Sequence, residues 1–210
     1  DMFNGIDITQ TRDYVKIDCH TYIGKFCKKY LDTWLNKVPL TENRPTPLPT
    51  DATWIKKFNA AVGPSDPTEQ SALATKMQIK YKAGVGEFIW AMTTCRPNIA
   101  FTSVKLSQSN SAPAEHHYHG LKHAIRYVYT TRHDGIYFWR TQPRPELPRG
   151  PLPTINSNCK DLLLYDRPQH DAHIAVAYGD SDWATCVKTR RSFSGICIQL
   201  AGGTIAYKTK

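Results

Sequence analysis

The sequence predicts an α+β fold, with strands near both ends of the chain and helices between them. Apolar and polar residues alternate over 3–8 and 14–17, and again from residue 174 onward, which is typical of strands with one buried face. In the intervening region apolar residues recur every three or four positions, which is typical of amphipathic helices. Five prolines at 141–153 separate the helical part from the second group of strands.

A β-hairpin and a helix are expected first. The alternating segments 3–8 and 14–17 flank a short segment at 9–13, so we expect two antiparallel strands there. Apolar residues from Tyr22 to Trp34 then follow helical spacing, which predicts an amphipathic helix over 20–35.

A helix is expected on each side of the Arg96-Pro97 pair. Val85, Phe88 and Met92 share one helical stripe, and this helix should end at Arg96 because the residue before a proline disfavours helical dihedrals. A second helix is expected over 99–107.

A longer helix is expected from Ser111 to about Thr131. Ser111 is a favourable N-cap residue, and Pro113 suits a first helical turn. Its apolar face should consist of Tyr118, Leu121, Ile125 and Val128. The opposite side should carry Lys122, His123, Arg126 and Arg132.

Three antiparallel strands are expected at the end of the chain. The first ends at Gly179-Asp180, the second covers 193–200, and the turn at 201–203 leads into a third over 204–208. These strands form the start of a sheet that still lacks covering helices. A strand that runs to residue 210 also suggests a piece of a longer polypeptide.

The composition favours a folded protein with an anionic partner. The chain has 27 Lys+Arg and 18 Asp+Glu, a net charge of +9, and most of this excess follows residue 80. It has no apolar run of 18 residues, so no transmembrane helix is expected. The six cysteines contain no C-x-x-C pair, which argues against a zinc ribbon and favours reduced intracellular thiols.

Two sets of residues could bind metal. Asp180 and Asp182 follow an expected strand, where a carboxylate is held rigidly, although such residues also commonly just form a turn. His116, His119 and His123 fall on one face of the expected helix at ligand-compatible spacing. A solvated helix face is the commoner explanation for three such histidines.

Basic residues near aromatic ones suggest contacts with nucleic-acid phosphates. Such contacts would give sequence-independent, salt-dependent binding. An ordinary solvated helix face is the alternative. The candidates are Lys122, Arg126, Arg132, Lys188, Arg190 and Arg191, with Tyr127, Tyr129 and Trp183 interleaved.

Several short segments, which are spread over nearly the whole chain, carry a resemblance to a known family. They are Tyr81–Trp90, Thr94–Ala100, Leu106–Gln108, Leu121–Tyr127, Asp134–Ile136, Tyr178–Ala184 and Arg190–Gly195, together with Phe3–Ile6 and Pro45–Pro47. In their order along the chain, these segments together resemble copia-type LTR-retrotransposon Pol polyproteins. The chain departs from that family at Asn98, where the family usually has aspartate.

The resemblance implies three regions. Residues 1–140 would be the C-terminal part of a reverse transcriptase, with a primer-grip hairpin, thumb and connection. Residues 141–171 would be a Pro-rich linker, and 172–210 the first antiparallel strands of an incomplete RNase H-like α/β domain. The primer-grip residues would be Phe3, Asn4, Gly5 and Ile6. Asp180 would be the first catalytic, metal-binding carboxylate of RNase H, whereas Asp182 would form a turn.

The resemblance also implies the chemistry of the parent protein. This would be Mg²⁺-dependent RNA-directed DNA synthesis and cleavage of RNA in RNA–DNA hybrids. Its partners would be a hybrid or primer–template duplex and the rest of the polyprotein, with no membrane, in a cytoplasmic particle or the nucleus. One carboxylate cannot bind two Mg²⁺ ions, so we expect this chain to be inactive alone. A non-catalytic nucleic-acid-binding protein and a degenerate transposon relic are the alternatives.

Overall fold

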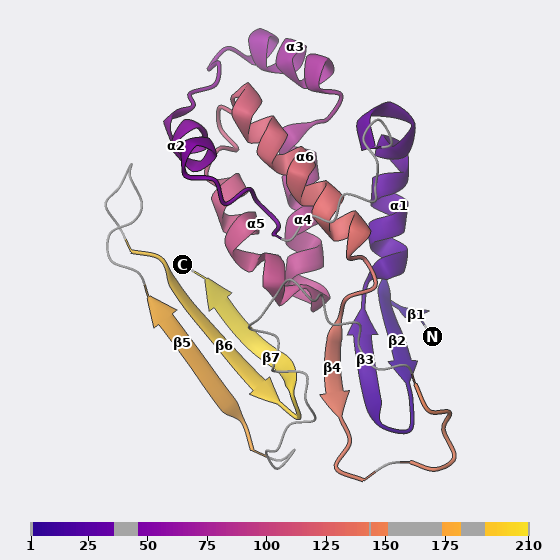
Figure 1. Ribbon diagram of the computed structural model, residues 1–210. Helices are drawn as coiled ribbons and strands as arrows, with labels where there is room; N and C mark the ends of the chain where they lie inside the picture. Colours follow the sequence, from indigo (N-terminus) through magenta and orange to yellow (C-terminus); the bar gives the residue numbers. More distant parts are fainter. Residues whose placement is uncertain (1, 36–45, 143, 151–173, 182–191, 210) are drawn as a thin grey trace.

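Two antiparallel sheets and a helical body make up the part of the chain that the structure describes (Figure 1). The structure is a computed structural model, and it describes residues 2–35, 46–142, 144–150, 174–181 and 192–209. The α+β class expected from the sequence is therefore compatible with the observed mixture of elements.

The first sheet contains four antiparallel strands in the order β1-β2-β3-β4. The strands are β1 (Met2–Phe3), β2 (Ile6–Gln10), β3 (Tyr14–Asp18) and β4 (Ile136–Trp139). The expected hairpin is confirmed by β2 and β3. Strand β4 was not expected, and it pairs with β3 so that Ile136 lies opposite Ile17.

The turn between β1 and β2 consists of Asn4 and Gly5, which both have positive φ values of 55° and 82°. This geometry matches a two-residue hairpin turn for which Asn-Gly is the preferred sequence. A Cβ atom on Gly5 would lie 3.0 Å from the ring of Trp90, so the turn packs closely on the helical body.

The helical body confirms the four expected helices and adds two more. Near the N-terminus are α1 (His20–Tyr30), one turn of π-helix (Leu31–Leu35), α2 (Ala52–Ala60) and α3 (Pro67–Met77). They are followed by α4 (Tyr81–Cys95), a 3₁₀ turn (Pro97–Ile99), α5 (Ala100–Ser107) and α6 (Glu115–Thr130). Helices α2 and α3 were not expected.

The start of α6 differs from the expectation that Ser111 caps it. Ala114 occupies the N-cap position, and its backbone N–H donates to Nδ1 of His117 at 2.9 Å. The Nε2 atom of the same ring donates to the carbonyl of Phe58 at 3.0 Å. The buried imidazole therefore satisfies the backbone N–H of the N-cap residue, and it also connects α6 to α2.

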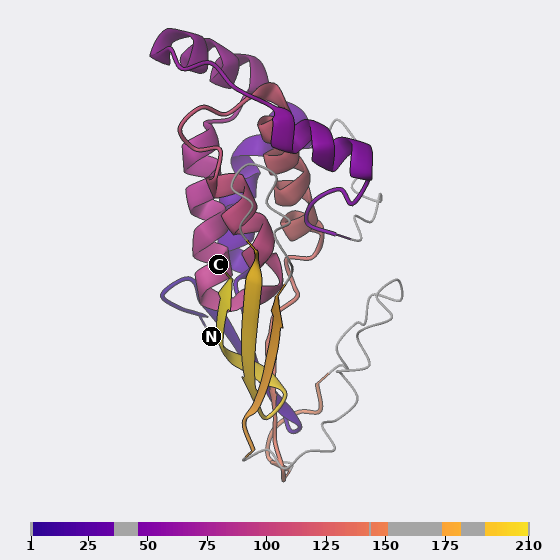
Figure 2. The same ribbon diagram turned by 90° about the vertical axis from the view of Figure 1, so that its left-hand side faces the viewer.

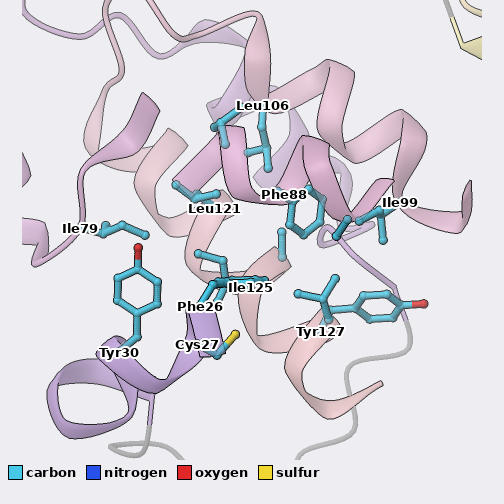
Figure 3. Packing of buried hydrophobic residues seen from close by; sticks show 14 of the residues in the cluster. Phe26, Cys27, Tyr30, Ile79, Phe88, Ile99, Leu106, Leu121, Ile125 and Tyr127 are labelled. Atoms are coloured by element: carbon cyan, nitrogen blue, oxygen red, sulfur yellow. The ribbon is translucent and has the colours of Figure 1, made fainter. Parts of the chain in front are cut away.

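The core lies where α6 packs against α1, α4 and α5 (Figure 3). Phe88 from α4 and Leu121 and Ile125 from α6 are completely buried in it. The expected apolar face of α6 is confirmed, since its four members are all buried. Burial of this continuous apolar surface is the main source of stability for the body.

The second sheet contains three antiparallel strands, as expected, in the order β5-β6-β7. They are β5 (Val176–Ser181), β6 (Ser194–Leu200) and β7 (Gly203–Thr209). Figure 2 shows this sheet extending below the helical body, in front of the first sheet. The backbone N–H of Trp139 in β4 donates to the carbonyl of Ala201 at 2.9 Å, and the hydroxyl of Tyr207 contacts the carbonyl of Met92.

Residues 144–150 of the proline-rich segment run alongside the turn between β2 and β3 and are hydrogen-bonded to it. The N–H of Arg12 donates to the carbonyl of Pro148 at 2.9 Å, and the N–H of Arg144 donates to the carbonyl of Arg12 at 3.0 Å. Most of the expected linker, 151–171, lies outside the described residues. Within the described ranges, no helix combines the length and apolar character needed to cross a membrane.

Candidate metal and nucleic-acid sites

Asp180 lies on β5, directly opposite Gly195 on β6, and is exposed. Among the described residues, no group of three potential metal ligands includes it. Asp182 lies outside the described residues. A pair of Mg²⁺ ions needs several converging oxygen ligands, and Asp180 alone does not meet that requirement.

A different group of potential ligands lies where the first sheet meets α1. Asp7 and Asp18 are buried there, and His20 lies beside them, with one ligand atom from each within 4.8 Å of the others. The Nδ1 atom of His20 is 2.6 Å from Oδ1 of Asp18 and 3.2 Å from Oδ2 of Asp7. No motif in the sequence identifies these residues, because Asp7 is distant along the chain from Asp18 and His20 and meets them through the pairing of β2 with β3.

The oxygens of this group already have protein partners. Asp7 accepts from the backbone N–H of Thr21 at 2.9 Å and from its hydroxyl at 2.8 Å. Asp18 accepts from the backbone N–H of His20 at 3.0 Å and from Nζ of Lys16 at 2.6 Å. The two carboxylates thus satisfy N–H groups in the first turn of α1 and suit its positive end. We therefore assign the group a structural role.

Electrostatics at this junction shift two pKa values. Burial alone would raise the pKa of Asp18, but hydrogen bonds from Lys16 and from the backbone and ring of His20 hold it below its ordinary value. Burial, reinforced by the nearby positive charge of Arg132, lowers the pKa of His133. The ring of His133 lies beside that of His20, with their centroids 5.1 Å apart.

The three histidines of α6 do not converge on one point. The ring centroids of His116 and His119 are 6.3 Å apart, whereas Nε2 of His123 lies 3.1 Å from the carbonyl of Thr46. All three residues are within the described part of the chain, and none belongs to a three-ligand group. The arrangement favours the alternative that they are ordinary residues of a helix surface.

Two of the candidate phosphate-binding residues lie over aromatic rings. The Nζ atom of Lys122 is 5.1 Å from the ring centroid of Trp34. The guanidinium of Arg132 is 4.9 Å from the ring centroid of Tyr129, and its Nη1 donates to the Tyr129 carbonyl at 3.0 Å. Both residues remain partly exposed, so their positive charges are held in defined positions at the surface.

Arg126 does not lie on the solvated side of α6, so that expectation is wrong. It is only 7% exposed, and its Nη2 donates to the carbonyl of Leu35 at 3.3 Å. The segment after α1 covers this side of α6, and a sequence periodicity gives no sign of that cover. Tyr127 is also buried, and its hydroxyl accepts from Nδ2 of Asn98 at 3.1 Å.

The remaining expected site residues are at the two ends of the chain. Phe3, Asn4, Gly5 and Ile6 form the tip of the first hairpin, where Phe3 is 71% exposed. Their role at a primer stays a prediction. Lys188, Arg190 and Arg191 lie outside the described residues, as does Trp183.

The candidate site is therefore the surface of a basic α+β protein, with an exposed hairpin tip and with cations held over aromatic rings. No family model matches the chain, and no solved structure matches it.

Three relatives are similar to the chain at low identity. The retrovirus-related Pol polyprotein from transposon TNT 1-94 of Nicotiana tabacum is 22% identical over 183 residues, which is 87% of this chain and 11% of the polyprotein. An uncharacterized mitochondrial protein of Arabidopsis thaliana is 26% identical over 187 residues, or 87% of this chain and 58% of that protein. The secreted RxLR effector protein 161 of Plasmopara viticola is 28% identical over 132 residues, or 63% of this chain and 72% of the effector.

The similarity to the tobacco polyprotein supports a retrotransposon Pol-related origin for the chain. The chain corresponds to only part of the tobacco and Arabidopsis proteins, at 11% and 58% of their lengths.

Proposed function

We propose that the chain is part of a copia-type retrotransposon Pol polyprotein. It would contain the thumb and connection of the reverse transcriptase over 1–140 and the first strands of RNase H over 172–210. The observation that carries this proposal is the similarity to the tobacco Pol polyprotein over 87% of the chain. The order of a hairpin, a helical body and an antiparallel sheet is consistent with it.

The proposed parent protein performs RNA-directed DNA synthesis and cleaves RNA in RNA–DNA hybrids, in a cytoplasmic particle or the nucleus. Its chemistry would depend on Mg²⁺, of which Asp180 would bind one ion together with carboxylates from other segments. This chain would contribute contacts to the duplex rather than catalysis, because Asp180 has no converging ligands among the described residues.

The contacts would come from positive charges that the fold holds in place. Lys122 lies on α6 and Arg132 follows the C-terminal end of that helix, and their side chains are ordered by Trp34 and Tyr129. Ordering a long side chain before binding lowers the entropy cost of a phosphate contact. Helix α1, which packs beside α6, adds exposed lysines, namely Lys25, Lys28 and Lys29 (Figure 1).

Removing the charges of Lys122 and Arg132 is expected to weaken duplex binding. The double variant Lys122→Gln/Arg132→Gln should bind a labelled RNA–DNA hybrid roughly three- to tenfold more weakly at moderate salt, because each lost phosphate contact removes counterion release. The slope of log affinity against log salt should fall by about 2 in magnitude. Fluorescence anisotropy over a salt series measures both quantities.

The matched control is Lys56→Gln/Lys57→Gln, which removes the same charge from exposed positions on α2. This control should retain most of the affinity. Equal weakening by both double variants would show that only net charge matters, and it would contradict a specific binding surface formed by Lys122 and Arg132.

The isolated chain is expected to leave an RNA–DNA hybrid intact in Mg²⁺, because a single carboxylate cannot position two metal ions. Gel analysis of a labelled hybrid should show no difference between the wild-type chain and Asp180→Asn. Cleavage by the wild-type chain that disappears in Asp180→Asn would disprove this prediction.

A further inference from the structure

One lysine on α1 already has an anionic partner within the protein. The Nζ atom of Lys29 donates to Oε1 of Glu87 on α4, and the same ammonium lies 5.0 Å from the ring centroid of Tyr30. In the part of the chain that the structure describes, neither Lys25 nor Lys28 pairs with a carboxylate, although both are exposed. The three exposed lysines of α1 are therefore not equivalent.

Glu87 is held more firmly than an ordinary surface carboxylate. Its side chain is 24% exposed, and its Oε2 atom is covered and has no hydrogen-bond partner among the described residues. Nearly one turn further along α4, Trp90 packs against Tyr22 of α1 with ring centroids 3.9 Å apart, which holds the two helices beside each other. Lys29 is consequently the counter-charge of a largely covered carboxylate, and moving it away would leave that carboxylate without compensation.

A phosphate and the Glu87 carboxylate would compete for the same ammonium group. Both anions accept charge-assisted hydrogen bonds, so a nucleic-acid phosphate can contact Lys29 only when the ion pair opens. The carboxylate also repels a phosphate that approaches this part of α1, because the two carry charges of the same sign. The ion pair therefore limits how far a row of phosphate contacts can extend from α1 toward α4.

We infer that Glu87 is a specificity-determining residue of the proposed nucleic-acid surface, because it occupies Lys29 and keeps phosphates away from the boundary between α1 and α4. The inference rests on the proposed function, in which the protein surface contacts the duplex backbone. Of the three lysines on α1, Lys25 and Lys28 contribute to that surface directly, whereas Lys29 contributes only when its ion pair is open. Neutralising Glu87 makes one further phosphate contact available.

Substitution of Glu87 by glutamine, which keeps the shape of the side chain, tests the inference on the full 210-residue chain. Glu87→Gln should bind a labelled RNA–DNA hybrid roughly two- to threefold more tightly than the wild-type chain, because Lys29 becomes available to a phosphate. The slope of log affinity against log salt should rise by about 1 in magnitude, and fluorescence anisotropy over a salt series measures both quantities. The double variant Glu87→Gln/Lys29→Gln should lose both gains.

Glu115→Gln is the matched control. Glu115 on α6 pairs with Lys76 on α3 at 2.8 Å, so this change also removes one carboxylate and releases one lysine, but between different helices. It should leave the affinity and the salt slope close to the wild-type values. Equal gains for Glu87→Gln and Glu115→Gln would show that only net charge matters and would overturn the inference. A gain that persists in the double variant without Lys29 would overturn it too.

The wild-type chain separates a failure of this inference from a failure of the proposed function. If the wild-type chain binds the hybrid and Glu87→Gln binds it no more tightly, the inference alone is wrong. If the wild-type chain shows no binding but Glu87→Gln does, the competition at Lys29 is supported and duplex binding by the natural chain is contradicted. Absence of binding by both chains would contradict the proposed function and the inference together.

Discussion

Replacing Arg96 with alanine is expected to lower the free energy of unfolding by about 3–5 kcal/mol. The Arg96 side chain is 1% exposed, and it connects the end of α4 to the end of α6. Its Nη1 and Nη2 donate to the carbonyl and hydroxyl of Thr131 at 2.9 and 2.8 Å, and its Nε donates to Oδ1 of Asn98 at 3.1 Å. Alanine would leave these acceptors without the guanidinium and create a cavity.

Urea unfolding followed by circular dichroism measures this loss. Arg144→Ala is the control, because the Arg144 side chain is exposed and pairs with Glu146 at the surface, so its effect should stay within about 0.5 kcal/mol. Arg96→Lys should recover only part of the stability, since an ammonium group cannot reproduce the planar fork. Similar stabilities for Arg96→Ala and Arg144→Ala would show that the buried guanidinium is not an anchor.

Replacing Asp18 with alanine is expected to lower the free energy of unfolding by about 3 kcal/mol or more near pH 7. The buried carboxylate accepts from Lys16 and from both the backbone and the ring of His20. Its removal would leave Lys16 with a positive charge that is largely buried and without its partner. Asp32→Ala removes an exposed carboxylate and should have little effect.

The Asp18 contribution should depend on pH in one direction. Its pKa in the folded chain is below the ordinary value of 3.8, so folding favours the charged form. The contribution is fully present above about pH 5 and is lost as the pH falls through 3.8 and then the lower folded value. The difference between the wild-type chain and Asp18→Ala should therefore shrink in acid. A constant difference from pH 7 to pH 3 would exclude this linkage.

Local sequence patterns were sufficient for the elements whose signals are strong. The alternation around Tyr14 identified the hairpin, and the stripe through Phe88 identified α4. Helices α2 and α3 could have been found from their caps: Asp51 accepts from the Trp54 N–H, and Asp66 accepts from the N–H groups of Thr68 and Glu69. Their short lengths and largely exposed side chains weaken the periodicity on which the prediction relied.

Contacts between segments that are distant in the sequence could not be predicted from local patterns. Periodicity placed Arg126 on the solvated side of α6, but the segment after α1 covers it. The cluster of Asp7, Asp18 and His20 depends on the register of two strands. These sites arise from tertiary structure, which short motifs do not encode.

The pairing of β3 with β4 has a consequence for how the chain is made. β3 and β4 are neighbours in the sheet, but in the sequence one precedes and the other follows the whole helical body. Ile17 can therefore pair with Ile136 only after all the intervening residues have been synthesised. During synthesis from the N-terminus, β3 therefore emerges from the ribosome long before its partner and presents an open edge in the meantime. The helices must fold and bring β3 and β4 together before these two strands can pair. The pairing of β3 with β4 is therefore a late event in folding. A chain arrested before residue 136 should therefore show rapid exchange of the β3 amides that point toward β4, while those bonded to β2 stay protected.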